Sequence, residues 1–265
     1  MPVTKPDPEG RKNGTGEKMY ILGIDFETTG LAESQDIVTE IGAVLWDWEA
    51  KMPVLMLNEL LKLPEGVKLN KVVVEMNGIT EALLKKFGED TQKAFKKLNK
   101  LSKTADYIMA HNVDFDKKFY TNSIARCGLD AELNAKLWLD SSCDVAYPIR
   151  IKTRKLVFLA AEHNFLSPYA HRAVFDVLTM FKVVQDYDIN EMIRSASEQK
   201  YEIVADVLFE DKNKAKERGY SWDTAQRLWV KTVRESSLRQ ECESCNFRVL
   251  VRKKGSTDEY MELRK

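Results

Sequence analysis

The run ILGIDFETTG, from Ile21 to Gly30, constrains this chain more than any other stretch of its sequence. Its apolar residues predict a buried strand, yet it carries two carboxylates, Asp25 and Glu27, one residue apart. Side chains of a strand alternate between its faces, so both acids point to the same side. Two like charges at this spacing repel each other unless a positive charge lies between them. The run therefore predicts either a strand that ends in a solvated loop or a site for a divalent metal ion.

Composition limits the kind of protein to which such a site can belong. The 265 residues suffice for one large domain, or for a domain of about 180 residues with a smaller appendage. The chain has 41 basic residues (Lys and Arg) and 41 acidic residues (Asp and Glu), so its net charge is zero. It therefore has no overall positive potential that would attract nucleic acid. Binding of phosphate must therefore be local, through a basic patch or through metal ions.

The cysteine content and the hydropathy pattern indicate a cytoplasmic protein. Four cysteines in a chain of this length do not form a disulfide framework and indicate reduced thiols. No apolar run reaches about 18 residues, so we expect no membrane span. Residues 1–18 are rich in Pro, Gly and charge and lack the apolar core of a secretory signal, so they predict a flexible tail.

Strand and helix patterns follow one another along residues 19–190. Strands are predicted at 20–25, 37–46, 54–61, 107–110 and 138–145. Helices are predicted after Thr80, which is a good N-cap, and at 91–101, 115–127, 155–163 and 173–187. Strands first, then strands alternating with helices, predict an α/β domain with a mixed central β-sheet flanked by helices.

The sequence changes character after about residue 198, and residues 199–265 are predicted to form a small basic and aromatic C-terminal module. Residues 211–240 hold eight Lys or Arg against four acids, with Trp222 and Trp229 among them. This stretch is similar to a small module of bacterial and phage proteins that handle nucleic acid. The two tryptophans are expected to form a small core, and the lysines either are solvated or contact a single strand. Cys242 and Cys245 supply only two of the four ligands that a structural zinc needs, and no histidine lies nearby in sequence, so no zinc site is expected.

Further carboxylates occur where a strand gives way to a helix. The segment HNVDFD, from His111 to Asp116, follows a strand, and HRAVFD, from His171 to Asp176, precedes a late helix. Four carboxylates from three distant segments provide the oxygen ligands that magnesium ions prefer. Two such ions roughly 4 Å apart can hold the attacking and the leaving oxygen of a phosphoryl transfer. A histidine, whose pKa lies near neutrality, suits the role of general base.

The motifs DFETTG, HNVDFD and HRAVFD, in this order, resemble those of the DEDDh 3′–5′ exonucleases. This RNase T-like family includes the proofreading epsilon subunit of bacterial DNA polymerase III. The resemblance spans about residues 19–187 and implies an RNase H-like exonuclease fold. It implies two Mg²⁺ ions as cofactors, which Mn²⁺ can replace. The catalytic residues that it implies are Asp25, Glu27, Asp116, His171 and Asp176, in which the four acids are the metal ligands and His171 is the general base.

The same resemblance implies contacts to the substrate. The main chain near Phe26 and the Thr28 hydroxyl lie where similar enzymes receive the terminal nucleotide. Leu31 or Ile41 would be an apolar wedge against the last bases. Two further residues, His111 and Asn112, would support the strand end and contact the substrate. Many relatives carry a histidine before the Gly-Ile-Thr that follows here at 78–80, whereas this chain has Asn77, which leaves one substrate contact open.

The function that these features favour is metal-dependent removal of nucleotides from single-stranded DNA 3′ ends, with release of nucleoside 5′-monophosphates. The enzyme would act alone or in proofreading beside a DNA polymerase, and a homodimer is common among similar enzymes. The catalytic motifs do not separate this function from that of an exoribonuclease acting on RNA 3′ ends, and only the C-terminal module favours DNA. A catalytically retired nucleic-acid-binding module is the alternative from another class. The five intact catalytic positions argue against it.

Overall fold

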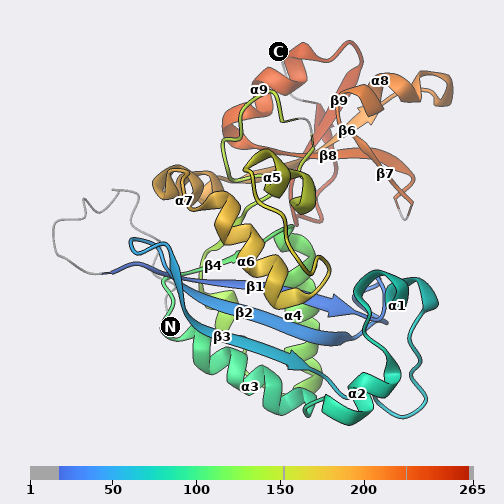
Figure 1. Ribbon diagram of the computed structural model, residues 1–265. Coiled ribbons are helices and arrows are strands. Elements are labelled where there is room, and N and C mark those ends of the chain that lie inside the picture. The colour runs from blue at the N-terminus through green and yellow to red at the C-terminus, as the bar shows by residue number, and fades with distance from the viewer. Residues whose placement is uncertain (1–17, 152, 225, 263–265) are drawn as a thin grey trace. The chain divides into compact units, whose positions relative to one another are not determined.

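The computed structural model of the chain describes residues 18–151, 153–224 and 226–262 (Figure 1). The predicted tail at 1–18 therefore lies outside the described residues, except for its last one. Contacts divide the chain into two compact units, with the division between Ala196 and Ser197. The predicted domain limits, 19–190 and 199–265, lie on either side of this division and stay a prediction. Within the described residues no helix combines the length and the apolar character that a membrane crossing needs.

A five-stranded mixed sheet forms the centre of the first unit, in the strand order β3-β2-β1-β4-β5. Its strands are β1 (Tyr20–Thr28), β2 (Val38–Asp47), β3 (Met52–Leu60), β4 (Tyr107–Ala110) and β5 (Trp138–Asp140). The pairs β1–β2 and β2–β3 are antiparallel, whereas β1–β4 and β4–β5 are parallel. The predicted α/β fold with a mixed central sheet flanked by helices is thus confirmed.

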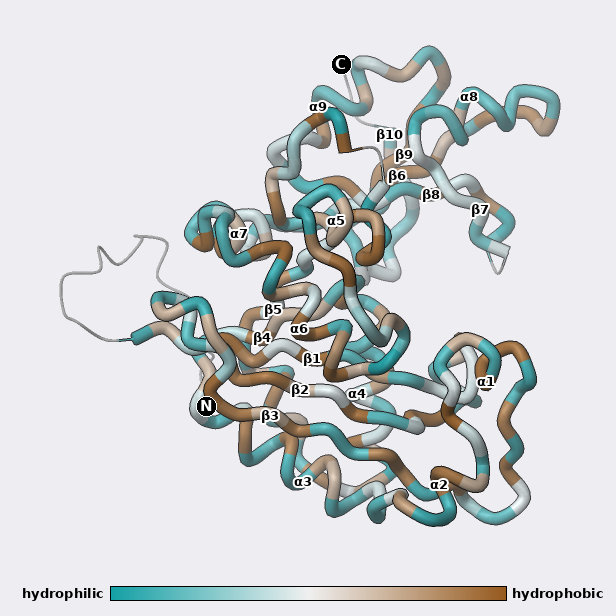
Figure 2. Tube along the Cα trace, viewed as in Figure 1, coloured by the Kyte–Doolittle hydropathy of each residue, from teal (hydrophilic) through white to brown (hydrophobic). Residues whose placement is uncertain are grey.

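Helices cover both faces of this sheet (Figure 1). On one face, α6 (Ala173–Val184) packs on β1 and β2, where its apolar residues join a cluster with Ile21 and Val44. On the other face, α3 (Thr91–Ser102) and α4 (Val113–Cys127) pack on Leu22, Ile24 and Phe26 of β1. Figure 2 shows the hydrophobic segments of β1, β2 and α6 in brown. The alternation of β1 therefore places Asp25 and Glu27 on the α6 face of the sheet.

The remaining helices of the first unit connect these layers. They are α1 (Lys71–Asn77), α2 (Glu81–Phe87), the 3-10 helix η1 (Glu132–Ala135), α5 (Leu156–Glu162) and α7 (Ile189–Ser197). The predicted N-cap at Thr80 is confirmed, since its side chain accepts a hydrogen bond from the main chain of Leu83. Helix α1 was not predicted, because its three consecutive valines favour a strand by propensity. Strand β5 ends at Asp140 and not at residue 145, because a turn follows it.

Two glycines let α6 lie close to the sheet. A Cβ atom on Gly42 of β2 would collide with the main chain of Ala173 and Val174, at the start of α6. A Cβ atom on Gly23 of β1 would collide with the side chain of Phe181, further along the same helix. The close approach of α6 to β1 and β2 therefore depends on the absence of a side chain at these two positions.

The second unit has the chain order of a split β-α-β fold. Its elements are β6 (Lys200–Asp206), η2 (Phe209–Asp211), α8 (Lys212–Glu217), β7 (Ser221–Asp223), β8 (Leu228–Arg234), α9 (Glu235–Ser244), β9 (Arg248–Lys253) and β10 (Met261–Glu262). The strands form an antiparallel sheet in the order β10-β9-β6-β8-β7. Trp229 packs against the core of this unit, whereas Trp222 is 48% exposed. The expectation that both tryptophans form a small core is therefore wrong for Trp222, because the short edge strand β7 leaves its ring in solvent.

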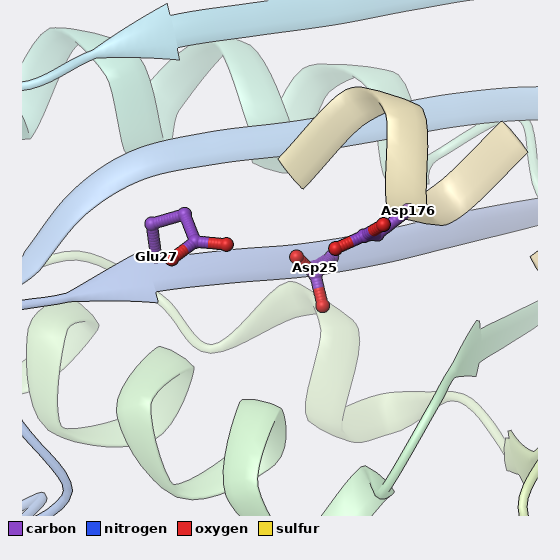
Figure 3. Close-up of side chains that lie close together, drawn as sticks. All are labelled: Asp25, Glu27 and Asp176. Carbon is purple, nitrogen blue, oxygen red and sulfur yellow. The ribbon is translucent and has the colours of Figure 1, made fainter. Parts of the chain in front are cut away.

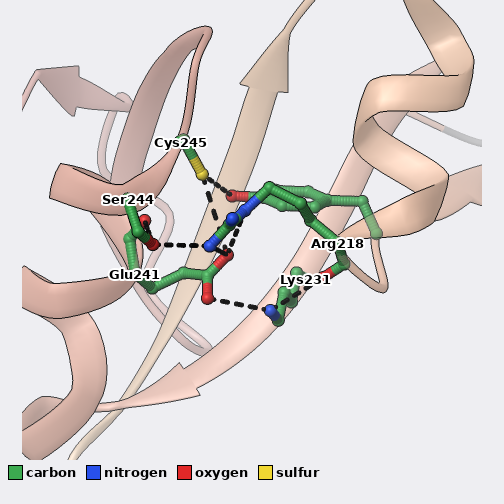
Figure 4. A network of polar contacts seen from close by, with 6 residues as sticks. Arg218, Lys231, Glu241, Ser244 and Cys245 are labelled. Carbon is green, nitrogen blue, oxygen red and sulfur yellow. Dashed lines mark hydrogen bonds and ion pairs between the residues drawn. The ribbon is translucent and has the colours of Figure 1, made fainter.

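A network of charged and polar side chains connects several elements of the second unit (Figure 4). The carboxylate of Glu241 on α9 accepts from Arg218 at 3.2 Å and from Lys231 of β8 at 3.1 Å. Arg218 also donates to the Ser244 hydroxyl, and Cys245 lies 3.7 Å from Glu241. Cys245 thus belongs to a network in which Glu241 forms ion pairs with both Arg218 and Lys231. Cys242 packs on the core of this unit.

We expect Gly42→Ala to lower the free energy of unfolding by roughly 2 kcal/mol, because main-chain atoms of α6 cannot rotate away from the added methyl group. Urea denaturation followed by circular dichroism measures this change. The exposed Lys85→Ala is the control and should stay within about 0.5 kcal/mol of the unaltered chain. An unchanged midpoint for Gly42→Ala would show that α6 does not lie this close to β2.

Candidate active site

Three carboxylates come together on the α6 face of β1 (Figure 3). Asp25 and Glu27 project from β1, and Asp176 projects from the first turn of α6. One oxygen of each residue lies within 4.8 Å of an oxygen of the other two. Carboxylate oxygens at this spacing can hold a divalent cation, and all three residues are among the four acids expected to be metal ligands.

Burial leaves these acids poorly solvated and raises their pKa values. The pKa of Glu27 rises to about 7, mainly because of burial, although a hydrogen bond from Asn77 opposes the rise. The pKa of Asp176 rises to about 6 for the same main reason. The pKa of Asp25 lies well above its usual range because of burial and because of the charges of Asp116 and Asp176. A cation among these groups would oppose the shifts, since it favours the ionised form of every one of them.

Asn77 supports Glu27 directly. Its Nδ2 atom donates to Oε2 of Glu27 at 2.9 Å, and its Oδ1 atom accepts from the main chain of Ile79 at 2.9 Å. Both bonds fix the orientation of the amide at the end of α1, where Gly78 turns the chain with a φ of 70°. The sequence indicated only that Asn77 replaces a histidine of many relatives. The contact to Glu27 was not foreseen, because it joins residues fifty positions apart.

Asp116 reaches the same strand from α4. It is buried, and its Oδ1 atom accepts from the main-chain N–H of Phe26 at 3.1 Å. This places Asp116 beside Asp25, whose pKa it helps to raise. Asp116 is not one of the three residues with mutual spacing below 4.8 Å within the part of the chain that is described.

Asp140 of β5 holds the start of α4 and was missed by the sequence analysis. Its carboxylate accepts from the main chain of Asn112 at 3.2 Å and of Val113 at 3.1 Å. Asn112 has a φ of 78°, and its own side chain makes no capping bond. The acid of a neighbouring strand therefore caps α4 in place of a local residue and fixes the turn that carries Asp116. The only sequence signal was an acid within the strand predicted at 138–145.

His171 precedes α6 and is exposed. Its φ is 62°, in the left-handed region that residues other than glycine rarely adopt. Its main-chain N–H donates to Oδ2 of Asp176 at 3.0 Å, so the predicted general base and the predicted metal ligand are joined through the backbone.

The residues expected to contact the substrate occupy different environments. Phe26 packs its side chain in the core, so only its main chain lies at the site. The Thr28 hydroxyl donates to the Gly30 carbonyl at 2.6 Å. Both ring nitrogens of His111 are bonded within the protein, to Ser141 and to the carbonyl of Arg154, so in this arrangement the ring supports the strand end. A direct contact of His111 with substrate would require at least one of these bonds to open.

Of the two candidates for an apolar wedge, the structure exposes one. Leu31 is 82% exposed just beyond the end of β1. Ile41 is fully buried on the face that α3 and α4 cover, so the expectation that it could act as the wedge is wrong. The reason is strand alternation, which turns Ile41 away from the α6 face.

The loop that carries Leu31 is tied to α4. Arg126 donates to the carbonyls of Asp36 and Ser34, each at 2.9 Å, and Asn122 donates to the carbonyl of Glu33 at 2.9 Å. Lys118 forms an ion pair with the Glu33 side chain at 3.2 Å. The three helix residues are spaced by four and therefore share one face of α4. The loop is thus held by a row of cationic and amide groups on one helix.

Sequence comparisons match this chain to known proteins. The RNase_T model, described as exonuclease, matches residues 22–184, more than half of the chain. The PolC-type DNA polymerase III of Listeria welshimeri is 28% identical over 174 residues, which cover 63% of this chain and 12% of the polymerase. That of Listeria monocytogenes is 28% identical over 152 residues, or 57% and 10%. The chain thus spans about a tenth of the length of these curated relatives.

Solved structures show the same fold. The nuclease domain of 3′hExo, a DEDDh family member bound to rAMP, superposes with a TM-score of 0.55 at 16% identity, covering 64% of this chain and 92% of that domain. E. coli exonuclease I in complex with a dA16 oligonucleotide superposes with a TM-score of 0.60 at 15% identity, covering 86% and 68%. The agreement with these structures confirms the expected RNase H-like exonuclease fold.

We expect the metal-free protein to lose stability as the pH rises from about 4 to about 7. The pKa values of Glu27 and Asp176 are about 7 and about 6 in the folded chain, against ordinary values of 4.5 and 3.8. The folded state thus holds more protons than the unfolded state in this window, and ionisation of these groups destabilises it. Urea unfolding in EDTA across the window measures the slope.

Glu27→Gln should flatten this slope and raise the free energy of unfolding near neutral pH by roughly 1–3 kcal/mol. The exposed Glu65→Gln is the matched control and should leave the slope as it is. A Glu27→Gln variant with the slope of the unaltered chain would contradict the shifted pKa of Glu27.

Proposed function

The chain belongs to the RNase T exonuclease family, and from this premise we propose that it removes nucleotides from the 3′ ends of single-stranded DNA, with release of nucleoside 5′-monophosphates. The observation that carries the proposal is the group of partly buried carboxylates from β1 and α6, with Asp116 of α4 beside it. Closely spaced acids that burial leaves poorly solvated are costly to a fold, and a retired nucleic-acid-binding module would have no use for them.

The residues present fit divalent cations. Asp25, Glu27 and Asp176 would hold one ion, and Asp25 with Asp116 would serve a second. Their donors are carboxylate oxygens, which suit Mg²⁺, and Mn²⁺ should replace it. Bound cations would lower the pKa of a water molecule and compensate the charge of the scissile phosphate and of the leaving oxygen.

The side chains and main chain of this protein then perform the remaining tasks. His171 accepts a proton from the attacking water at a ring nitrogen. The water oxygen forms a bond to phosphorus, and the bond from phosphorus to the 3′-oxygen breaks, which leaves a strand shorter by one nucleotide. Asn77 and the N–H of Phe26 hold Glu27 and Asp116 in place throughout. Leu31 would pack on the terminal base, a contact that tolerates every base.

DNA is preferred over RNA as the proposed substrate because of the C-terminal module and the relatives. Trp222 is 48% exposed beside Trp229, with ring centroids 5.5 Å apart. The ammonium group of Lys216 lies 5.6 Å from the Trp229 ring, and that of Lys212 lies 3.9 Å from the Phe209 ring. Aromatic rings with cations beside them suit the bases and phosphates of a single strand. The likeness to PolC-type polymerases supports action beside a DNA polymerase, and a homodimer stays a proposal.

The experiment that tests the function uses two oligonucleotides of the same sequence, one DNA and one RNA, each labelled at the 5′ end. The expected result with Mg²⁺ is a ladder that shortens from the 3′ end of the DNA, and EDTA should abolish it. Faster loss of the RNA would assign the enzyme to RNA maturation. Binding of either strand without shortening would favour the retired module.

Asp116→Asn should lower the rate of shortening by a factor of at least about 10³, because the amide cannot replace a charged ligand. Asp114→Asn, two positions earlier on the same helix, is the matched control and should retain the rate within a few-fold. Gel electrophoresis of the labelled DNA measures both variants. Equal loss in the two variants would show that the effect comes from the helix and not from the ligand.

Trp222→Ala should raise the KM for long single-stranded DNA by roughly 3–10-fold, because one stacking contact is lost. The kcat and the KM for a trinucleotide should stay unchanged, since the proposal gives Trp222 a contact with a longer strand and no role at the bond that breaks. Steady-state kinetics on both substrates measure the difference. A parallel rise of KM for the trinucleotide would rule out a separate contact at Trp222.

A further inference from the structure

Glu40 of β2 is a further buried acid beside the site that the proposed reaction does not use. Its exposure is 0%, and it is paired in register with Glu27 across the β1–β2 ladder. It therefore lies on the α6 face of the sheet, among the other acids. Within the described residues the group that could hold a cation comprises Asp25, Glu27 and Asp176, and does not include Glu40.

The carboxylate of Glu40 is occupied by the residues that follow His171. Nε of Arg172 lies 3.1 Å from both oxygens, and Nη2 lies 2.6 Å from Oε1. The main-chain N–H of Ala173 donates to Oε2 at 3.1 Å. This bidentate geometry fixes both the position and the orientation of the guanidinium group. We call these two side chains the Glu40–Arg172 clamp.

The clamp acts on a stretch of chain whose conformation needs support. The φ of 62° at His171 costs free energy for a residue with a Cβ atom, so neighbouring contacts must impose it. Three consecutive residues have such contacts: His171 donates to Asp176, Arg172 binds Glu40, and Ala173 donates to Glu40. Gly42, on the same face of β2 as Glu40, brings the main chain of Ala173 against the strand.

We propose that the Glu40–Arg172 clamp positions His171 for its role as general base, an inference that rests on the proposed function. The side chain of His171 is exposed, and its main-chain conformation determines where the ring can reach. Catalysis by a general base depends on placing it within about 1 Å of the productive geometry. Both members of the clamp are positioning residues, because they act through the backbone of His171. Their charged groups bind each other and do not contact the substrate.

Two variants test the clamp without leaving a buried charge unpaired. Arg172→Lys keeps the positive charge but removes the fork that binds both oxygens of Glu40. The double variant Glu40→Gln with Arg172→Gln removes both charges and keeps polar atoms at both positions. The ion pair of Lys97 and Glu59, in the same unit on α3 and β3, provides the matched control, Lys97→Gln with Glu59→Gln. Thermal unfolding shows that each variant is folded at the temperature of the assay.

The first readout is independent of nuclease activity. In the ¹⁵N-labelled full chain, the amide order parameters of His171 and Ala173 should be near the rigid value of about 0.85, and both clamp variants should lower them below about 0.6. The control variant should leave them unchanged. Unchanged order parameters in both clamp variants would overturn the inference, whether or not the protein degrades DNA.

The second readout is a kinetic cycle with His171→Ala. In the presence of His171, the double clamp variant should lower kcat at least tenfold and change KM less than twofold. In the His171→Ala background, the same two substitutions should change kcat less than twofold, because the group that they position is gone. An equal loss in both backgrounds would show that the clamp acts through Asp176 or the fold, and would overturn the inference. If the unaltered chain shortens neither DNA nor RNA, the proposed function fails, and the order parameters alone decide on the clamp.

Discussion

Repulsion among buried carboxylates is the interaction on which the rest of this structure depends. Asp25, Glu27 and Asp176 lie within one small region, and Asp116 adds a fourth charge beside them. Burial leaves each of these groups poorly solvated in the folded state and thereby raises its pKa. A fold can keep such a group together only if strong apolar packing surrounds it, and β1 has a buried cluster on either face. The acids are held by the sheet and do not hold it together.

The packing of α6 links this electrostatic problem to the geometry of the site. One helix supplies Asp176 and is preceded at once by His171, so its distance from the sheet fixes both residues. Two glycines, Gly23 and Gly42, set that distance by offering no side chain to the helix. The salt bridge between Glu40 and Arg172 then fixes the rotation and the start of the same helix. Apolar packing at the two glycines and the salt bridge at the start of α6 therefore both fix the position of this helix on the sheet.

The sequence predicted what is local and missed what depends on distant contacts. The three motifs, most of the strands and the N-cap at Thr80 follow from periodicity and from residues close together in the chain. The contact of Asn77 with Glu27 joins residues 50 positions apart, and that of Arg172 with Glu40 joins residues 132 positions apart. No spacing rule predicts such pairs, because they exist only once the sheet and the helices have assembled.

Errors of prediction have similar causes. The three valines of α1 favour a strand, but Asn70 caps this segment as a helix through the main chain of Val72. Ile41 and Leu31 are equally apolar, and only the alternation of β2 decides that the first is buried. Trp222 was expected in a core, but the second unit places it on a short edge strand. In all three places, the position of a residue in the assembled sheet or helix overrides the preference of its side chain.

The row of residues on α4 that holds the loop of Leu31 has a mechanical consequence. Asp116 lies in the first turn of this helix and Arg126 in its last, about 15 Å further along the axis. The loop of Leu31 and the acidic centre are therefore both attached to one helix. If the exposed leucine meets the end of the strand, the span from that end to the bond that breaks is a fixed length. Each round of cleavage would then remove a segment of the same length, because the helix keeps this distance constant.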